Sequence, residues 1–442
     1  MSSYVTKKTP GDTAWFTHDR FGMFIHFGLY ALPARHEWIK ANESISDEKY
    51  AKYFEHFNPD LFDAEDWARQ AKAAGMKYVV LTAKHHEGFC LFDSKYTDYK
   101  STNTPFGRDI CKEYAEAFRK QGLKVGFYYS LIDWHHLHFT VDMYYPRNRE
   151  PNAQLLNEGR DMKKYAEYMR NQVEELLTNY GEIDILWFDF SYAHHKTPAD
   201  RPWAKGKGKD DWEAEKLIAL ARKIRPGIII NNRSGVEQDI YTPEQYQPQE
   251  WIRHAQTGEL VNWEACQTFS GSWGYYRDEN TWKSPEMLIN MLINTVSLGG
   301  NLIMNVGPTS RGYFDYRAEN ALKVYAEWMK YNSRSIYGCT MAEKQFIAPN
   351  GCKLTQSVDG KRLYIHVVDY PFKELHVLGL KDKIDYVQFL HDGSEILFSS
   401  PSELFHNGEA GKKSEQQEQV VVFKLPIIKP NTLIPVIEIF LK

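Results

Sequence analysis

Five apolar runs of the chain end in side chains that can hydrogen-bond a hydroxyl group or pair with a charge. If these runs are parallel strands of a barrel, their carboxyl ends meet on one rim, which is where barrel enzymes carry their active sites. A single polar residue in such a place is more often structural, but five strand ends together indicate a binding or catalytic site. The residues at these ends are His26, His85, His86, Tyr128, Tyr129, Trp187, Asp189 and Arg233.

Asp189 is the sharpest catalytic candidate among these residues. It follows DILWF at 184–188, where a buried strand would normally continue with apolar residues. Because a carboxylate at a barrel mouth costs stability unless it is paired, we expect a chemical role for it. An ion pair with Arg233 is the structural alternative.

The aromatic content of 14% is a mild pointer to carbohydrate, because the C–H faces of sugars stack on aromatic rings, although an aromatic-rich core gives the same composition. Glycoside hydrolysis needs two carboxyl groups, which retaining enzymes set about 5–5.5 Å apart. With Asp189 as one of them, the second must come from a later loop. Spacing alone does not choose among the candidates, which are Glu237, Glu244, Glu250 and Glu264.

The adjacent residues His85 and His86 raise the question of a metal site. Neighbouring residues on a regular strand point to opposite faces, so the two side chains cannot easily bind one ion, and no HxH pattern accompanies them. Hydrogen bonding to sugar hydroxyls is the preferred interpretation, and we expect neither metal nor cofactor. A metal-dependent barrel hydrolase with His26, His85 and His86 as ligands is an alternative that full activity in a chelator would exclude.

Strands and helices that could position these residues alternate over the first three quarters of the chain. Near-continuous apolar runs are typical of strands buried on both faces of a parallel sheet, and the amphipathic stretches between them predict helices. No glycine-rich phosphate loop is present, which argues against a nucleotide-binding doubly wound sheet. A seventh strand is uncertain near Trp263–Thr268, and an eighth has no candidate. The predicted strands are 22–28, 77–86, 124–131, 184–190, 227–233 and 301–308, and the predicted helices are 63–75, 108–122, 159–181, 210–226 and 284–300.

The pattern changes after a helix around 316–333. Short apolar runs follow one another without helical stretches between them, which predicts a small antiparallel sandwich. We therefore expect an α/β fold, a (β/α)8-like barrel over 1–338 followed by a C-terminal antiparallel β-sandwich over 339–442. The predicted sandwich strands are 362–370, 374–380, 385–392, 419–425 and 433–441, and the polar segment 405–419 is expected to be a hairpin loop.

Composition and charge limit the partners. A net charge of −4 over 442 residues, with no basic stripe, argues against nucleic acid. The sequence contains no run of about 18 apolar residues, so it predicts no membrane span. The N-terminus lacks the apolar core of a signal peptide, and five scattered cysteines form no CxxC pair. These features favour a reducing, cytoplasmic location, or an extracytoplasmic one if a native signal peptide was removed; whether the chain forms a homo-oligomer is open.

A set of short motifs occurs in order along the chain. The motifs are GMFIHFG at 22–28, HEW at 36–38, KHHEGF at 84–89, YYS at 128–130, LWFDF at 186–190, NNR at 231–233, TPEQ at 242–245, WEACQTFSGSWGY at 263–275 and GGNLIMNVGP at 299–308. Together they resemble glycoside hydrolase family 29, the retaining α-L-fucosidases. The resemblance runs from about residue 12 to about residue 340 and implies a (β/α)8-like barrel with a C-terminal β-sandwich.

The resemblance also implies roles for single residues. Asp189 matches the nucleophile, and Trp273 matches an aromatic residue near the methyl group of fucose. TPEQ resembles the loop that carries the acid/base, which favours Glu244, with Glu264 as the alternative acid/base. The stretch QYQPQEWIRHAQTGELVN at 245–262 is longer than the simplest family pattern. The residues that match the family's fucose-binding positions are His26, Glu37, Trp38, His85, His86, Tyr128, Trp187 and Arg233.

The activity that the resemblance implies is that of a retaining exo-α-L-fucosidase. Its substrate would be a fucosylated oligosaccharide or glycoconjugate, cleaved by double displacement with an aspartate nucleophile and a glutamate acid/base. Two alternatives are a glycosidase for a sugar related to fucose and a non-catalytic carbohydrate-binding barrel. A binding protein would be expected to have lost one of the two carboxylates.

Overall fold

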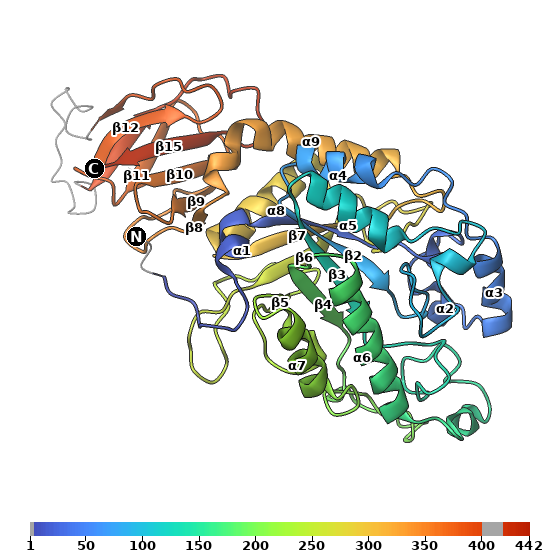
Figure 1. The fold of residues 1–442 in the computed structure, drawn as a ribbon. Helices are drawn as coiled ribbons and strands as arrows, with labels where there is room; N and C mark the ends of the chain where they lie inside the picture. Colours follow the sequence, from blue (N-terminus) through green and yellow to red (C-terminus); the bar gives the residue numbers. More distant parts are fainter. Residues whose placement is uncertain (1–3, 400–418) are drawn as a thin grey trace.

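Seven parallel strands form one curled sheet at the centre of the N-terminal part of the computed structural model (Figure 1). The structure describes residues 4–399 and 419–442. The strands lie in the order β5-β4-β3-β2-β1-β7-β6, so neighbours in the sheet are mostly neighbours in sequence, as in a (β/α)8 barrel. They are β1 (Phe21–Ile25), β2 (Tyr78–Lys84), β3 (Lys124–Ser130), β4 (Ile185–Asp189), β5 (Ile229–Ile230), β6 (Glu264–Thr268) and β7 (Asn301–Val306).

The eighth position of the barrel is filled by an irregular segment. The edge strands β5 and β6 do not pair with each other, and segment 240–244 lies between them. The predicted (β/α)8-like fold is confirmed, with seven strands in the described residues. Single bridges take the place of the eighth strand, and Pro243 in this segment has no N–H to donate to a ladder. The parallel bridges join Asn231 to Ile240, Tyr241 to Trp263 and Glu244 to Cys266.

Helices cover the outside of the sheet, and the sequence marks where most of them begin (Figure 1). An aspartate or serine just before the helix accepts a hydrogen bond from a main-chain N–H of the first turn in α4, α5, α6, α8 and α9. The short helices α1 (Ala14–Asp19), α2 (Ile39–Asn42) and α3 (Asp47–Glu55) were not expected from the sequence. The helices that follow strands are α4 (Ala64–Ala73), α5 (Ile110–Lys120), α6 (Met162–Asn179), α7 (Ala214–Ile224), α8 (Pro285–Ser297) and α9 (Tyr316–Asn332).

Side chains of the strands alternate between the inside of the curled sheet and its helix-covered outside. Phe24, Tyr128 and Trp187 belong to a buried cluster on the inside, whereas Met23 and Phe127 pack in the larger core that the helices share. The next inward position on each strand lies two residues further on, at the carboxyl rim. Those positions are held by His26, Ser130, Asp189 and, on β7, Asn305.

Antiparallel strands form the C-terminal part, as predicted. A five-stranded sheet, β12-β15-β10-β9-β8, faces a three-stranded one, β11-β14-β13, over a core of its own that includes Leu363, Val377, Phe423 and Ile439. Strands β8, β9 and β13 were not expected from the sequence, and most of the predicted loop 405–419 lies outside the described residues. The strands are β8 (Cys339–Met341), β9 (Cys352–Ser357), β10 (Arg362–Val367), β11 (Glu374–Leu378), β12 (Ile384–Phe389), β13 (Phe398–Ser399), β14 (Val420–Lys424) and β15 (Val436–Leu441).

The sandwich joins the barrel near the amino end of β1. Arg20, the residue before β1, donates from Nε to the carbonyl oxygen of Cys339 at 2.8 Å, and the amide of Gly338 donates to the carbonyl of His18 at 2.8 Å. The sandwich is therefore attached at the end of the barrel opposite to the carboxyl rim of β1.

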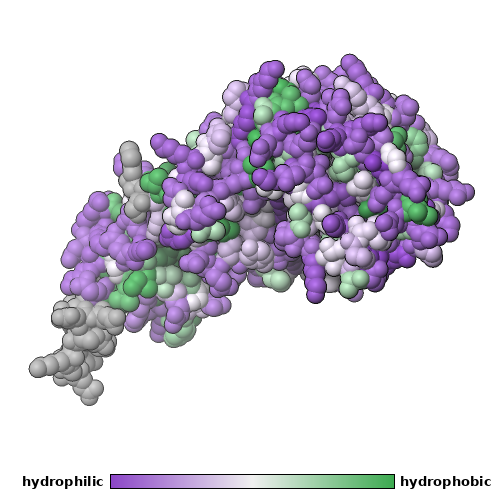
Figure 2. Space-filling view, turned by 90° about the horizontal axis from the view of Figure 1, so that it is seen from below, coloured by the Kyte–Doolittle hydropathy of each residue, from purple (hydrophilic) through white to green (hydrophobic). Residues whose placement is uncertain are grey.

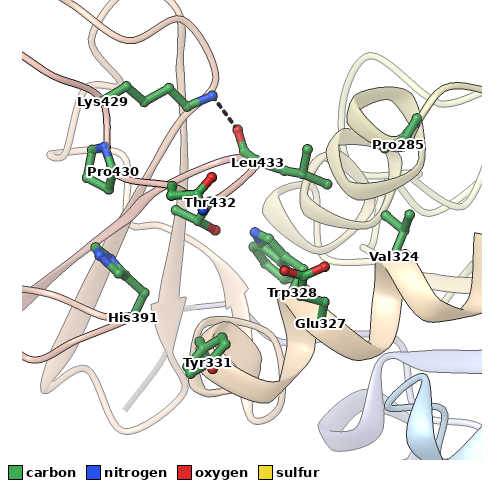
Figure 3. Close-up of a pocket in the computed structure, with 11 residues that line it drawn as sticks. Pro285, Val324, Glu327, Trp328, Tyr331, His391, Lys429, Pro430, Thr432 and Leu433 are labelled. Carbon is green, nitrogen blue, oxygen red and sulfur yellow. Dashed lines mark hydrogen bonds between the residues drawn. The ribbon is translucent and has the colours of Figure 1, made fainter.

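A cleft of about 900 Å³ lies between α9 and segment 429–433 of the sandwich (Figure 3). Trp328 of α9 closes one side of it, and the indole N–H of Trp328 donates to the carbonyl of Ile434 at 3.1 Å. None of the residues that line this cleft lies at the carboxyl end of a barrel strand. The cleft is therefore a feature of the domain junction and separate from the predicted site.

The outer surface is mainly hydrophilic on the face that Figure 2 shows, with small separate hydrophobic patches. Within residues 4–399 and 419–442, no helix is both long and apolar enough to cross a membrane.

Candidate active site

Eleven of the residues proposed from the sequence for the site line a single small cavity at the carboxyl rim of the barrel. Phe24 and Phe190, which the sequence did not single out, line it as well. Glu264 lies below this cavity in the barrel interior, and the strand-end residue Tyr129 and the candidates Glu237 and Glu250 do not line it. The lining residues from the sequence are His26, Glu37, Trp38, His85, His86, Tyr128, Trp187, Asp189, Arg233, Glu244 and Trp273.

Asp189, the last residue of β4, is held by two donors. The hydroxyl of Tyr128 donates to Oδ2 and the guanidinium of Arg233 donates to Oδ1, both at 2.9 Å. Burial, and then the charge of Asp189, raises the pKa of Tyr128 well above its ordinary value, so its hydroxyl stays protonated as a donor. The expected ion pair with Arg233 is present, and it leaves the carboxylate oriented at the cavity wall.

Arg233 also binds the second carboxylate. It lies on the short 3-10 helix η4 (Asn232–Ser234) after β5, and its Nη1 is 2.6 Å from Oε2 of Glu244. Since the same nitrogen is 2.9 Å from Oδ1 of Asp189, these two oxygens are separated by no more than the sum of the two distances, about 5.5 Å. That upper bound allows the spacing of about 5–5.5 Å that retaining glycosidases set between their two carboxyl groups.

The irregular eighth position of the barrel carries Glu244. The amide of Cys266 on β6 donates to the carbonyl of Pro243, and the amide of Gln245 donates to the carbonyl of Cys266. Gln245 has a φ of 57°, in the left-handed region, so the chain turns sharply straight after Glu244. These bonds fix the backbone on both sides of a side chain that is itself 39% exposed.

A second, larger cleft adjoins the inner cavity on the side of Glu244. It has a volume of about 750 Å³ and is walled mainly by the chain that follows β4, including His194, His195 and Asp210. Asp189, Phe190, Arg233 and Glu244 line both cavities. The two carboxylates therefore lie where the inner cavity opens into the outer cleft.

Glu264 has a different environment. It is fully buried on β6, where Tyr78 donates to Oε2 at 2.6 Å and the indole of Trp187 donates to Oε1 at 3.1 Å. Burial raises the pKa of Glu264 to about 7, against the lowering effect of those two hydrogen bonds and of the charge of Arg233. Both oxygens are used beneath the cavity, and one of them fixes the ring of Trp187.

Glu37 connects two loops across the cavity. Its Oε2 accepts from the main-chain amides of Trp273 at 3.1 Å and Gly274 at 2.9 Å. The carboxylate thereby holds Trp273, which packs against Phe24 and His26 at ring distances of 6.0 and 5.1 Å. This wall of the cavity is aromatic, as expected for the apolar edge of a sugar.

His85 and His86 both line the cavity, which contradicts the expectation that they face opposite ways. Strand β2 ends at Lys84, and the chain turns at these residues, so the alternation of a regular strand does not hold for them. Their ring centroids are 4.0 Å apart. Even so, no cluster of three or more histidine, cysteine, aspartate or glutamate residues in the described ranges is arranged to hold a metal ion.

Phe190 is a site residue that sequence reasoning missed. It follows Asp189 with a φ of 76°, a region that non-glycine residues rarely occupy, and its ring packs against Trp38 and His86 at 5.3 and 5.0 Å. The only signal in the sequence is that another aromatic residue follows the aspartate in LWFDF.

This fold and this site together define a class: a barrel enzyme with paired carboxylates at the carboxyl rim. The sequence model described as Alpha-L-fucosidase matches residues 3–334. The chain therefore belongs to the α-L-fucosidase family of glycoside hydrolases.

Individual relatives cover most of both chains. The solved structure of α-L-fucosidase isoenzyme 1 from Paenibacillus thiaminolyticus is 40% identical, with a TM-score of 0.87 over 97% of this chain and 98% of that one. The plasma α-L-fucosidase of Homo sapiens is 31% identical over 73% of this chain and 69% of its own length. A structure of a glycoside hydrolase family 29 α-L-fucosidase from Bacteroides thetaiotaomicron, a covalent intermediate trapped with 2-fluoro-fucosyl fluoride in a glutamate-to-glutamine mutant, is 26% identical, with a TM-score of 0.80 over 99% and 98% of the two chains.

Proposed function

We propose that the protein removes terminal α-L-fucose from fucosylated glycans with net retention, using Asp189 as nucleophile and Glu244 as acid/base. The observation that carries the proposal is the pair of carboxylates on one guanidinium nitrogen, at a separation compatible with double displacement. Family membership supports the sugar, and the covalent intermediate trapped in the Bacteroides relative supports retention.

In the first step Asp189 attacks the anomeric carbon while Glu244 gives its proton to the glycosidic oxygen. The bond between that carbon and the leaving oxygen breaks as the ester to Asp189 forms. In the second step Glu244 takes a proton from water, the water oxygen bonds to the anomeric carbon, and the ester breaks to free Asp189. The two inversions leave the product in the α configuration.

The surroundings of each carboxylate suit these roles. Asp189 is almost fully buried with both oxygens bonded, which holds a nucleophile in one orientation. Glu244 faces the outer cleft, where a leaving sugar and then water would reach it. The buried position of Glu264 under Trp187 offers no comparable access, which favours Glu244 as the acid/base.

The fucose ring would occupy the inner cavity. Its methyl edge suits the aromatic wall of Phe24 and Trp273, and its hydroxyl groups suit the histidines, Glu37 and Trp38. A related sugar with a hydroxymethyl group in place of the methyl is the second candidate substrate. Comparing aryl α-L-fucoside with aryl α-L-galactoside tests this choice, since an aromatic wall at the methyl position should favour the fucoside.

Stereochemistry tests the mechanism. When hydrolysis of an aryl α-L-fucoside is followed by proton NMR before mutarotation, α-fucose should be released first. Initial release of β-fucose would establish inversion and would remove Asp189 from the nucleophile role.

A further inference from the structure

The three histidines of the cavity share one arrangement: each uses Nδ1 for a hydrogen bond within the protein. Across residues 4–399 and 419–442, their Nε2 atoms have no hydrogen-bond partner. None of these three Nε2 atoms is among the side-chain atoms that are fully buried and lack a partner. The Nε2 atoms are thus available to a ligand. The Nδ1 partners are Asn305 Oδ1 for His26 at 2.6 Å, Glu87 Oε2 for His85 at 3.3 Å and Ser130 Oγ for His86 at 2.6 Å.

The contacts of Asn305 determine which atom of His26 carries the proton. The side-chain amide of Asn305 lies 2.6 Å from the carbonyl oxygen of Trp273. A carbonyl can only accept, so the NH2 group of Asn305 must face it and Oδ1 must face His26. Because Oδ1 can only accept as well, the proton of His26 is on Nδ1.

Ser130 imposes the same state on His86. A serine hydroxyl has one proton, and Ser130 donates it to the carbonyl oxygen of Ile132 at 2.7 Å. Toward His86 the hydroxyl oxygen is therefore an acceptor, and the proton of His86 is on Nδ1. Glu87, a buried carboxylate on the chain that turns after β2, accepts from Nδ1 of His85 in the same way.

The charge state of two of these rings supports this reasoning. Burial, and then the charge of His85, lowers the pKa of both His26 and His86 well below the ordinary value of 6.5. Both rings are therefore neutral at neutral pH. A neutral imidazole with its proton on Nδ1 has a lone pair on Nε2 and can only accept there.

We propose that Asn305 and Ser130 are positioning residues that fix His26 and His86 with the proton on Nδ1, so that two Nε2 acceptors face the hydroxyl groups of the sugar, and that Glu87 orients His85 through its Nδ1. The inference rests on the proposed fucosidase function for the identity of the ligand. Fucose has three hydroxyl groups besides the anomeric one, and each can donate to such an acceptor.

The arrangement gives a physical reason for motifs whose remaining residues had no role. KHHEGF, YYS and GGNLIMNVGP each contribute one of the three positioning residues. Ser130 and Asn305 occupy inward positions at the carboxyl rim, on β3 and β7. They hydrogen-bond the histidines that follow the neighbouring strands, His86 after β2 and His26 after β1.

The test combines spectroscopy with ligand binding. In protein labelled with 15N-histidine, two-bond proton–nitrogen correlation spectra at pH 7.5 should show a protonated Nδ1 and an unprotonated Nε2 for His26 and His86. The signals are assigned with His26→Gln and His86→Gln variants.

The positioning residues are then replaced. Asn305→Ala should shift the tautomer of His26 only, and Ser130→Ala that of His86 only. Each variant should also weaken inhibition by free fucose about 3–10-fold, the effect of one hydrogen bond. Ser130→Thr, which keeps the hydroxyl, should restore both readouts.

Two variants outside the site are matched controls. Asn332 and Ser335 are also fully buried, and each donates from its side chain to a main-chain carbonyl. Asn332→Ala and Ser335→Ala should leave the histidine spectra and the fucose inhibition unchanged.

The outcomes separate this inference from the proposed function. A protonated Nε2 on His26 or His86 in the unaltered protein overturns the inference even if the protein cleaves fucosides. This measurement does not depend on whether any variant folds. Variants that leave the spectrum and the fucose inhibition at control values overturn it as well. If fucose does not bind while the spectra are as expected, the proposed function fails and the assignment of the tautomers stands.

Discussion

At the scale of single residues, the two carboxylates that bind Arg233 differ in how far they are exposed to solvent. Asp189 has both oxygens occupied and a side chain 12% exposed, whereas the side chain of Glu244 is 39% exposed and borders the outer cleft. A nucleophile needs a fixed orientation, and an acid/base needs access to the leaving group and to water. The difference in surroundings therefore agrees with the proposed division of roles.

Replacing Glu244 with glutamine tests the acid/base role. A general acid matters most when the leaving group is poor, so Glu244→Gln should slow hydrolysis of a fucosyl disaccharide by about 10²–10⁴-fold. An activated aryl fucoside should lose much less in the first step, and the covalent intermediate should accumulate. Rates on the two substrates, with and without azide, provide the measurement. Azide needs no general base, so it should restore turnover and give α-fucosyl azide, because it displaces Asp189 from the opposite face.

Asp189→Gly is the contrasting variant. It should lose activity on every substrate regardless of leaving group, and any product formed with azide should be β-fucosyl azide, since only one displacement then occurs. If Glu244→Gln behaves like the unaltered protein while Glu264→Gln shows the leaving-group dependence and azide rescue, the acid/base is Glu264.

At the scale of elements, strand β6 carries a buried carboxyl group with an unusual stability effect. The pKa of Glu264 is about 7 in the folded protein, because burial disfavours the charged form, against 4.5 in the unfolded chain. The folded state therefore binds the proton more tightly. The contribution of Glu264 to the free energy of unfolding is complete below about pH 4.5 and is lost as the pH rises through 7.

Urea unfolding of the unaltered protein and of Glu264→Gln at pH 5 and pH 8 measures this effect. The free energy of unfolding of the unaltered protein should fall relative to that of the variant as the pH rises, by a difference on the order of 3 kcal/mol. The difference between the two proteins cancels the other titrating groups. Equal pH dependence in both proteins would show that Glu264 does not retain its proton on folding.

Strands that contain an uninterrupted apolar run were predictable, whereas the strand whose run is broken by polar residues remained uncertain. β2, β4 and β7 are buried on both faces, so their sequences are almost continuously apolar. β6 remained uncertain because Glu264 interrupts its pattern, and the partners that satisfy Glu264, Tyr78 and Trp187, come from distant parts of the chain. Segment 240–244 joins its neighbours by single bridges and forms no continuous ladder. Its sequence therefore lacks the apolar run that marks a regular strand.

The candidate site was predictable where a residue type alone states the chemistry. Asp189 stands out as a carboxylate after an apolar strand, and Glu244 was favoured only through the resemblance of TPEQ, since any of four glutamates fitted the spacing. Phe190, Ser130 and Asn305 were not identified as site residues. Their contributions come from a backbone angle and from hydrogen bonds across neighbouring strands, which the order of residues does not reveal.

At the scale of the whole molecule, the described part of the β-sandwich is attached to the barrel away from the candidate site. It is attached near the amino end of β1, through Arg20 and Cys339, whereas the candidate site lies at the carboxyl rim (Figure 1). Among the residues that the structure describes, none that lines the inner cavity or the outer cleft comes from the sandwich. In barrels, residues at the amino end of the strands contribute chiefly to stability.

Glu438 of β15 allows this separation to be tested with one substitution. Its carboxylate is buried and accepts from Gln388 at 2.6 Å within the sandwich and from Arg334 at 3.0 Å, on the 3-10 helix η5 (Ser333–Ser335) that follows α9. Glu438→Gln removes the charge that these donors share, so the free energy of unfolding should fall by about 1–3 kcal/mol. The kcat/KM for an aryl fucoside should stay within about threefold of the unaltered value, because Glu438 lines neither the inner cavity nor the outer cleft. Asp385→Asn, an exposed carboxylate on β12, is the matched control and should change neither quantity. A large fall in kcat/KM without a loss of stability would show instead that the sandwich acts on the site through the barrel.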